Sequence, residues 1–282
     1  KTMLARALPS ILPDLTFDES IEVTKIYSVA HARMRSAHLT KERPFRSPHH
    51  TSSSVALVGG GAWPKPGEVS LAHQGVLFLD EFPEFKRSAI ENLRQPLEDG
   101  VVTISRAAGS LEFPANFMLV AAMNPCPCGF LTDPVKQCTC RPHAVEKYQQ
   151  KISGPLLDRI DLGIEVPRVE FEKLTSTTNL ETSHDVRMRV QRARDVQRTR
   201  YKKEGIGSNA QLRSTMIRKH CALEEEGMQL IKKAVKSFHL SARAYTRLLK
   251  VARTIADIAQ EKHITPHHIA EALQYRPKLK TE

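Results

Sequence analysis

The chain has 282 residues, 40% of them hydrophobic, which is enough to bury a sizeable core in one large or two smaller domains. No run approaches the roughly 20 apolar residues of a membrane span and no secretory signal is visible, so we expect a cytoplasmic protein with no membrane partner. The 42 lysine and arginine residues against 31 acidic residues give a net charge of +11, which favours a polyanionic partner such as nucleic acid or a nucleotide.

The sequence opens on Lys1 and Thr2, without a methionine, and continues with apolar residues at helical spacing from Leu4 to Ile11. A lysine and a hydroxyl residue that open a helix are also the last two residues of the P-loop. There the lysine reaches the β- and γ-phosphates of a nucleotide and the hydroxyl ligates Mg²⁺. The glycines that precede this pair in a P-loop are not in the sequence. Taken alone, the pair is more commonly a simple helix cap.

The segment Gly75 to Glu81, GVLFLDE, places four large apolar residues directly before two acids. In a P-loop ATPase a buried strand ends beside the phosphates, where it supplies an aspartate to the magnesium shell and a glutamate that polarises the attacking water. Asp80 and Glu81 fit those two roles. The alternative is a strand that runs into an acidic turn, but the combination with Lys1 and Thr2 favours the ATPase interpretation.

A second apolar strand is predicted at residues 117–123, FMLVAAM, and it stops at Asn124. A fully apolar run of this length is typical of a central parallel strand that is covered on both faces. An amide at the end of such a strand, beside Asp80, is suited to orienting the attacking water. Asn124 is therefore a further candidate site residue.

Two segments predict β-hairpins. Residues 52–71, SSSVALVGGGAWPKPGEVSL, place β-prone runs on either side of a glycine- and proline-rich tip that contains Trp63 and Lys65. Residues 101–113 place two short runs around a turn, with Arg106 beside the turn. A flat ring, two mobile cations and glycine-rich tips suit sequence-independent contact with DNA. The alternative is that Trp63 is buried by its own hairpin and Lys65 is merely exposed.

Four cysteines form two C-x-C pairs separated by nine residues: Cys126, Cys128, Cys138 and Cys140. Four thiolates this close together can complete a tetrahedral zinc site, and the residues between them are turn-forming. The C-x-C spacing is less specific than C-x₂-C, so unligated thiols and a redox pair are the alternatives. A surface position is the prediction for the nearby and paired histidines: His143, His49, His50, His267 and His268.

Arg159 lies in the segment GPLLDRIDLGIEVP, which predicts a helix or turn followed by another short apolar strand. In many such ATPases an arginine donated across a subunit boundary stabilises the transferring phosphate. Considered alone, the motif favours a plainer alternative, in which Arg159 pairs with Asp158 or Asp161.

The distribution of patterns predicts two domains. Up to about residue 170, apolar strand-like runs alternate with helical segments, and residues 16–19 and 88–91 both spell capping boxes, which indicates an α/β domain with a parallel sheet. Beyond the polar linker at residues 175–183, helix signals repeat, including a Thr265-Pro266 helix start. Residues 187–203 carry eight basic residues, and an apolar stripe on the same helix comprises Val186, Val190, Ala193 and Val196. This basic helix is either a solvated face or a surface for nucleic acid or a neighbouring subunit.

A family resemblance rests on four stretches: Lys1-Thr2, FRSPHHTSSSVALVGGGAWPKPGEVSLAHQGVLFLDEFPEF, AAMNPCPCGF and GPLLDRIDL. Together they resemble the magnesium-chelatase-like AAA+ ATPases, in particular the ComM/YifB branch. The resemblance implies a P-loop AAA+ α/β core with a parallel sheet and two β-hairpin insertions at residues 1–170, followed by a small helical lid at residues 171–282. It also implies ATP and Mg²⁺ as ligands, and a homo-oligomeric ring, expected to be a hexamer, with the hairpins pointing into its pore.

For the site, the resemblance implies a Walker A end at Lys1 and Thr2, Walker B acids Asp80 and Glu81, sensor-1 Asn124, arginine finger Arg159 and sensor-2 Arg243. Arg243 lies at a predicted helix start among other arginines, so a plain surface charge is the alternative for it. Because the P-loop glycines are missing from the sequence, we expect this chain by itself to bind nucleotide poorly.

These observations predict an ATP-driven ring that moves its hairpins along DNA, as a helicase or branch-migration motor in recombination or natural transformation. One alternative is a motor for metal insertion that resembles the magnesium chelatase subunit and acts on a partner protein and a tetrapyrrole. A second is a non-enzymatic, zinc-bearing interaction module. The basic charge and the cysteine cluster argue against the chelatase, since neither is needed to drive a protein partner.

Overall fold

The computed structural model describes residues 1–30, 39–61, 64–106, 109–167 and 181–277. The chain divides into two compact units, Lys1–Arg159 with Val166–Thr177, and Ile160–Glu165 with Thr178–Glu282. Each unit is described by itself below. The predicted domain boundary at residue 170 lies outside the described residues and stays a prediction.

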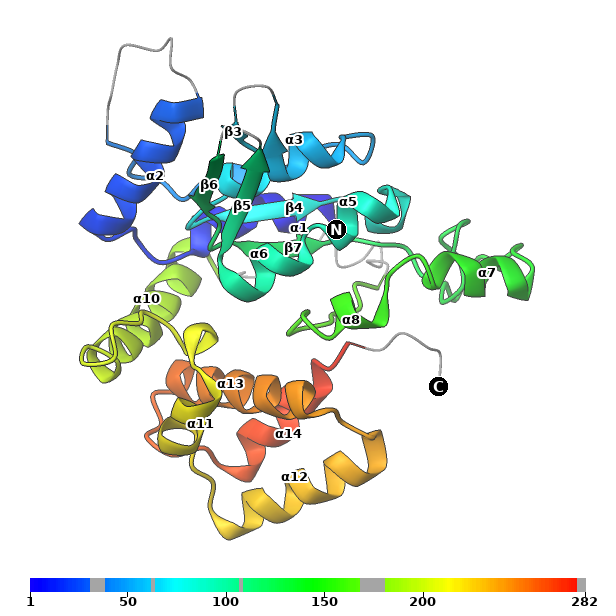
Figure 1. The fold of residues 1–282 in the computed structure, drawn as a ribbon. Helices are drawn as coiled ribbons and strands as arrows, with labels where there is room; N and C mark the ends of the chain where they lie inside the picture. The colour runs from blue at the N-terminus through cyan, green and yellow to red at the C-terminus, as the bar shows by residue number, and fades with distance from the viewer. Residues whose placement is uncertain (31–38, 62–63, 107–108, 168–180, 278–282) are drawn as a thin grey trace. The chain divides into compact units, whose positions relative to one another are not determined.

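The centre of the first unit is a three-stranded parallel sheet with the order β1-β4-β7 (Figure 1). Its strands are β1 (Phe45–Arg46), β4 (Val76–Leu79) and β7 (Met118–Ala121). Every residue of β4 is buried, because the strand lies between the other two and carries only apolar side chains. In the described sheet β7 pairs with β4 along one side, and both of its end residues are exposed, so the predicted cover on both faces is not seen among these residues.

The helices of the first unit follow the predicted alternation with strands. They are α1 (Thr2–Ala7), η1 (Leu8–Ile11), α2 (Phe17–Ala30), α3 (Ser54–Val58), α4 (Glu68–Leu71), η2 (Phe82–Glu84), α5 (Arg87–Glu91), α6 (Arg94–Asp99), α7 (Pro142–Gln149) and α8 (Gly154–Leu157). The capping box before α2 is confirmed, because Glu19 N–H donates to Thr16 Oγ1 and Thr16 N–H donates to the Glu19 carboxylate. The one predicted at Ser88 is wrong: the N-cap residue of α5 is Lys86, so Ser88 lies inside the first turn of the helix.

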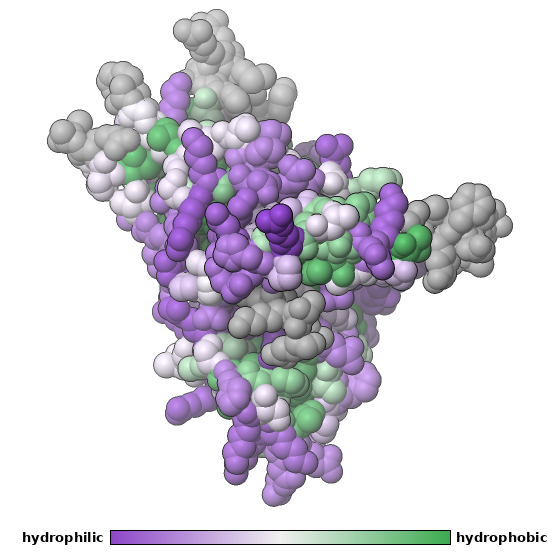
Figure 2. Space-filling view, turned by 90° about the vertical axis from the view of Figure 1, so that its right-hand side faces the viewer, coloured by the Kyte–Doolittle hydropathy of each residue, from purple (hydrophilic) through white to green (hydrophobic). Residues whose placement is uncertain are grey.

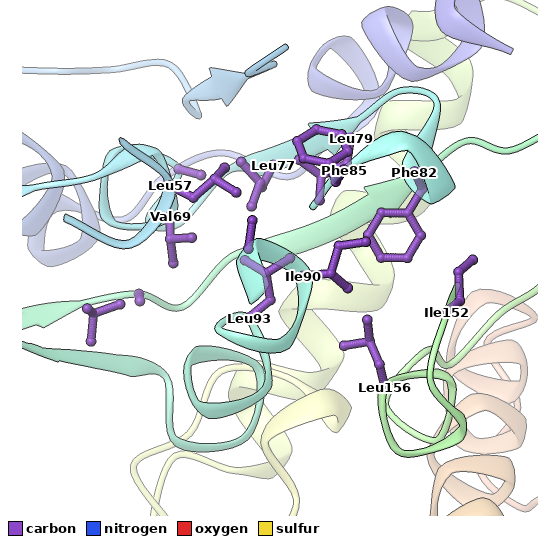
Figure 3. Close-up of a cluster of buried hydrophobic side chains, with 14 of the residues drawn as sticks. Leu57, Val69, Leu77, Leu79, Phe82, Phe85, Ile90, Leu93, Ile152 and Leu156 are labelled. Carbon is purple, nitrogen blue, oxygen red and sulfur yellow. The ribbon is translucent and has the colours of Figure 1, made fainter. Parts of the chain in front are cut away.

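A single hydrophobic cluster holds β4 against the helices of this unit. Figure 3 shows Leu77 and Leu79 of β4 among side chains that come from α5, α8 and the segments around the first hairpin, including Ile90 and Leu156. All of these side chains are buried, and each contributes roughly 1.5–3 kcal/mol relative to an exposed position. The cluster therefore fixes the strand after which Asp80 and Glu81 follow.

The two predicted hairpins differ in how well they match the structure. Strands β5 (Val101–Arg106) and β6 (Gly109–Pro114) form the second hairpin as predicted. The first is reduced to β2 (Gly59–Gly60) and β3 (Lys65–Pro66), and the expected strand before it is the helix α3. The reason is local: the Ser53 hydroxyl accepts a hydrogen bond from Ala56 N–H and caps α3, which overrides the β-propensity of the valines.

The bases of the two hairpins pack against each other. Gly59 has a positive φ of 108°, and a Cβ atom at this position would lie 2.6 Å from the Lys65 carbonyl oxygen and 2.9 Å from Ile104 Cδ1 of β5. Such distances are too short for any side chain larger than hydrogen. Glycine at position 59 therefore allows the first hairpin to close directly on the second.

The second unit is helical. Its elements are α10 (Ser183–Arg200), η3 (Asn209–Gln211), α11 (Ser214–His220), α12 (Glu225–Phe238), α13 (Ala242–Ile258) and α14 (Pro266–Gln274). Thr265 caps α14 with Pro266 at its first position, as predicted. The basic helix is confirmed as α10, but its apolar stripe is only partly correct, because Ala193 and Gln197 are buried whereas Val196 is exposed. Among the described residues, the helices all fall short of the length and apolarity that crossing a membrane requires.

The segment between α8 and α10 departs from the prediction. Residues 160–167 have no regular secondary structure, so the short strand expected after Arg159 does not form. Its apolar side chains Leu162, Ile164 and Val166 are 47%, 69% and 41% exposed. The face of the molecule in Figure 2 is mostly hydrophilic, with hydrophobic residues in smaller patches between the polar ones. Exposed apolar residues such as Leu162, Ile164 and Val166 mark a contact surface when they form a contiguous patch.

A buried polar network, absent from the sequence predictions, fixes the second unit internally. The carboxylate of Asp257 on α13 is fully buried and accepts hydrogen bonds from Arg253 Nε (3.1 Å), Asn209 Nδ2 (2.8 Å) and Arg200 Nη1 (2.9 Å). Two guanidinium groups and one amide thus satisfy a single carboxylate. The network ties together α10, η3 and α13, three elements that are separate in the sequence.

Replacing Asp257 by alanine removes the shared acceptor and leaves two arginines without their buried counter-charge. We expect the free energy of unfolding of the second unit to fall by about 3–5 kcal/mol. Chemical denaturation followed by circular dichroism measures the change. Asp195→Ala on the exposed side of α10 is the control, with an expected change within about 0.5 kcal/mol. Equal losses in the two variants would contradict a special role for the network.

Candidate functional site

Residues from three distant segments meet beyond the carboxyl ends of β4 and β7. Thr2 Oγ1 donates to Asp80 Oδ2 at 2.6 Å. Lys1 Nζ donates to Asn124 Oδ1 at 3.0 Å and to the Met123 carbonyl oxygen at 2.6 Å. The structure therefore brings together the start of α1 and the two strand ends, as the sequence predicts for one shared site. In parallel α/β sheets, ligands bind at this carboxyl edge.

Glu81 follows Asp80 in an unusual backbone conformation. Its φ and ψ of 50° and 46° lie in the left-handed region, which non-glycine residues adopt uncommonly and which is enriched at functional sites. Glu81 N–H donates to Asp80 Oδ1 at 3.0 Å, so both oxygens of Asp80 accept hydrogen bonds. The Glu81 side chain is 60% exposed, and its Oε2 lies 3.1 Å from His50 Nδ1.

The chemistry of the donor set fits a magnesium nucleotide. A carboxylate and a hydroxyl in contact, Asp80 and Thr2, are hard oxygen ligands of the kind that Mg²⁺ takes together with phosphate oxygens. Within the described residues, the hydrogen bonds of the Lys1 ammonium go to two neutral oxygens, the Met123 carbonyl and the Asn124 amide. Phosphate oxygens are stronger acceptors for an ammonium group than either of these. The exposed carboxylate of Glu81 is accessible to water.

The two predicted arginines lie in different units. Arg159, just after α8, donates through Nη1 to the Pro155 carbonyl oxygen at 2.6 Å and forms an ion pair with Glu98. The ion-pair partner that the structure shows is thus neither Asp158 nor Asp161, the two acids expected from the sequence. Its Nε is buried with no hydrogen-bond partner in the described part of the chain. Arg243 lies in the first turn of α13 in the second unit, and its role stays a prediction.

The candidate DNA contacts are only partly described. Lys65 is exposed and begins β3, and Arg106 is the last residue of β5. Trp63 lies outside the described residues, so the choice between an exposed and a buried ring stays open. Both basic positions fall on the hairpins, as predicted.

The four cysteines form one cluster with the geometry of a metal site. The sulfur of Cys126 lies 3.4 Å from that of Cys128 and 3.7 Å from that of Cys138, and the latter two are 3.6 Å apart. The sulfur of Cys140 completes the group, in which all four lie within 4.8 Å of one another. Four thiolates at about 2.3 Å from zinc stand roughly 3.8 Å apart at the corners of a tetrahedron, whereas a disulfide needs about 2.05 Å. The distances therefore fit ligation better than oxidation.

Backbone hydrogen bonds prepare part of this cluster for ligation. The N–H groups of Phe130 and Thr139 lower the pKa of the Cys128 thiol to about 6, which favours its thiolate. The pKa values of the Cys138 and Cys140 thiols are raised instead, and desolvation and the neighbouring sulfurs contribute to this rise. Gln149 of α7 donates to the Pro125 carbonyl oxygen at 3.1 Å and so anchors the start of the cysteine segment. His143 is exposed and stands outside the cluster, as predicted. The surface prediction is wrong for His268, which is buried because it closes the capping box of α14 with Thr265.

One residue next to the site was missed by the sequence analysis. His50 is predicted as an ordinary surface histidine, but its Nδ1 contacts the Glu81 carboxylate. The register of the sheet could have identified His50. Arg46 pairs with Leu77, and His50 and Glu81 each lie four residues further along their own segments. This identification requires knowing that β1, a strand of only two residues, lies beside β4.

The parallel sheet with its helices, followed by a helical region, is the architecture of an AAA+ core with a helical domain. The chain belongs to the magnesium chelatase subunit ChlI family. Residues 1–174 match the family described as magnesium chelatase, subunit ChlI, and residues 180–276 match its C-terminal family.

Curated relatives place the chain within the ComM/YifB branch. It is 47% identical over 281 residues to competence protein ComM of Haemophilus influenzae, an alignment that covers 99% of this chain and 54% of that protein. It is 46% identical over 277 residues to the uncharacterized protein YifB of Escherichia coli, covering 98% and 53%. The uncharacterized protein Rv2897c of Mycobacterium tuberculosis is 42% identical over 277 residues, covering 98% and 54%. The chain thus spans about half the length of the curated relatives it matches.

Proposed function

We propose that the chain is the motor part of a ring-forming ATPase that acts on DNA. The observation that carries the ATPase proposal is the contact between Thr2 Oγ1 and Asp80 Oδ2 beside Lys1 and Asn124. A hydroxyl, a carboxylate, an ammonium and an amide at the carboxyl edge of a parallel sheet are the groups that a magnesium nucleotide requires. Thr2 and Asp80 are 78 positions apart in the sequence, and Lys1 and Asn124 are 123 apart, which makes a chance assembly a poor explanation.

In the proposed mechanism, each residue has one task. Lys1 would exchange its carbonyl and amide contacts for β- and γ-phosphate oxygens, and Thr2 and Asp80 would hold Mg²⁺, whose charge would offset that of the phosphates. Glu81 accepts a proton from water as the water oxygen attacks the γ-phosphorus, and the bond from that phosphorus to the ADP oxygen breaks. The Asn124 amide orients the same water.

Two arginines complete the proposed reaction. Arg159 of a neighbouring subunit stabilises the charge that develops on the transferring phosphate, once its ion pair with Glu98 is exchanged for the phosphate. Arg243 acts from the helical lid. The exposed apolar residues that follow Arg159, including Leu162 and Ile164, support a subunit contact in this region. A homo-oligomeric ring, a hexamer in our proposal, provides that neighbour.

Glu81→Gln tests the hydrolytic part of the proposal in full-length protein with a complete phosphate loop before Lys1. We expect ATP binding to persist while turnover falls about 10²-fold or more, because the amide cannot accept the proton but the Mg²⁺ ligands remain. Glu84→Gln is the matched control: this nearby, partly exposed acid pairs with Lys151 instead, and its loss should leave turnover unchanged. Near-normal hydrolysis by Glu81→Gln would remove Glu81 from the mechanism.

DNA is the proposed substrate on which the motor acts. The net charge of +11 supports a polyanionic partner, and Lys65 and Arg106 carry charge on the hairpins. The Haemophilus influenzae relative is named a competence protein, which supports a role in natural transformation or recombination. We propose helicase or branch-migration activity in the cytoplasm, where ATP and DNA are both available.

Lys65→Ala combined with Arg106→Ala tests whether the hairpins grip DNA. In the ATP-bound state we expect weaker binding and a salt slope reduced by roughly one to two units, because about 0.9 counterions are released per phosphate contact. Unwinding of labelled forks should fall further than binding, while basal hydrolysis survives. The comparison variant replaces three exposed or half-exposed arginines of α10: Arg192, Arg194 and Arg198. Normal unwinding by the hairpin variant, with loss in the α10 variant, would assign DNA binding to α10 instead.

A chelatase-type motor is the second candidate function, and the family description supports it. Such a motor drives a protein partner and a tetrapyrrole and needs no affinity for DNA. ATP turnover that is indifferent to fork, duplex and single-stranded DNA, together with no DNA binding at low salt, would favour this candidate.

We also propose that the cysteine cluster holds a structural zinc ion. Stoichiometric zinc should appear in elemental analysis of the reduced protein, and Cys126→Ser with Cys138→Ser should lose it together with local stability, because ligation and folding are coupled. Cys221→Ala is the control, since this buried cysteine stands outside the cluster and should leave the zinc content unchanged. Reduced protein without zinc, and with unchanged stability in the double variant, would contradict the site.

A further inference from the structure

The segment that follows β7 has almost no packed core. The structure describes all of residues 124–141, and they form neither helix nor strand. Cys126 is the only buried residue among them. Ordering the backbone costs roughly 1–2 kcal/mol per residue, which apolar burial usually offsets. In this segment the four-cysteine cluster is the group that can take the place of a core, because metal ligation and folding are coupled.

Two connections join the cysteine cluster to Asn124. Along the chain, Pro125 alone separates Asn124 from Cys126. Through space, Gly129 lies against the Asn124 amide: its φ is 83°, and a Cβ added at this position would lie 3.7 Å from Asn124 Nδ2. The N–H of Gly129 donates to the Cys126 carbonyl oxygen at 3.0 Å, which closes the turn. The turn that carries the first cysteine pair therefore forms a wall beside the amide.

The far end of the segment returns to the same place. One residue after Cys140 the helix α7 begins, and its last turn contacts the residues that follow β7. Gln149 Nε2 donates to the Pro125 carbonyl oxygen at 3.1 Å, and the buried Tyr148 places its hydroxyl at the backbone N–H of Asn124. A metal ion shared by the four sulfurs would cross-link the start of this loop to its end and so hold α7 in place.

The Asn124 amide depends on these contacts for its orientation. Asn124 is exposed, so packing does not fix its side chain. Its Oδ1 accepts from Lys1 Nζ, but the proposed mechanism moves that ammonium group to phosphate oxygens. The turn at Gly129 and the backbone contacts of α7 then remain to hold the amide. A displacement of about 1 Å in a positioning group can cost about 10²-fold in rate.

We propose that the metal-bound cysteine cluster is the positioning element for Asn124, so that ATP hydrolysis depends on zinc although zinc takes no part in the chemistry. This inference rests on the proposed function, because it requires that Asn124 orients the attacking water and that the cluster binds zinc. The cysteines act only through the amide. Lys1, Thr2 and Asp80 lie outside the loop, so nucleotide affinity does not depend on the cluster.

Replacement of the ligands tests this role in full-length protein with a complete phosphate loop. We expect Cys126→Ser combined with Cys138→Ser to lower kcat for ATP about 10- to 100-fold, with unchanged affinity for a non-hydrolysable ATP analogue. Cys140→His keeps a fourth zinc ligand and should retain zinc and most of the wild-type kcat. Cys221→Ala, outside the cluster, is the control and should change neither zinc content nor kcat.

A double-substitution cycle shows whether the cysteines act through Asn124. Asn124→Ala should lower kcat by at least as much as the two cysteine substitutions, and adding these to it should lower kcat no further. Losses that multiply would overturn the positioning role. If the cysteine variant is unstable, wild-type protein freed of zinc with a chelator and returned to Mg²⁺ buffer gives the same comparison, and added zinc should restore kcat.

The outcomes separate this inference from the proposals on which it rests. Normal hydrolysis by Asn124→Ala would remove Asn124 from the mechanism, and protein without zinc would remove the metal site; either result also ends this inference. If Asn124→Ala is impaired and zinc is bound, but the zinc-free protein hydrolyses ATP normally, both proposals stand and the link between them is wrong. Loss of nucleotide affinity together with kcat, or a zinc-loaded Cys140→His protein as inactive as the serine variant, would likewise overturn the link.

Discussion

Burial of β4 is the constraint on which the rest of the first unit depends. A strand with four consecutive apolar residues must be covered on both faces and paired on both edges, and β1, β7 and the surrounding helices provide this cover. Because all three strands are parallel, the polar residues that follow them emerge at the same edge of the sheet. Asp80, Glu81, Asn124 and His50 are neighbours for this reason, and Thr2 joins them from the start of α1.

Sequence patterns predicted the parts of the site that short motifs encode. In the run GVLFLDE, the apolar residues predict a buried strand and the two acids predict the chemistry at its end. Asp80 and Glu81 were therefore identified as candidates without knowledge of their neighbours. The capping box at Thr16 and the helix start at Thr265 were likewise local and correct. The error at Ser88 has a local cause too, because the conformation of the preceding residue decides where a helix begins and the motif does not encode it.

What the sequence could not provide depends on pairing between distant segments. His50 matters because a two-residue strand lies beside β4, and a strand that short leaves no periodicity to detect. Asp257 was not singled out because three of its partners come from α13, α10 and η3, and their meeting is a property of the packed unit. Similarly, the apolar composition of residues 118–121 predicts a strand but not whether that strand lies at the centre or the edge of a sheet.

The close approach at Gly59 has a mechanical consequence. With no side chain between them, the base of the first hairpin rests directly on Ile104 of the second, and Leu57 and Val69 share a buried cluster with Val102. Two hairpins that are separate insertions in the sequence thus have a common foundation. We therefore expect a displacement of one hairpin base to be transmitted to the other, so that the two hairpins move together.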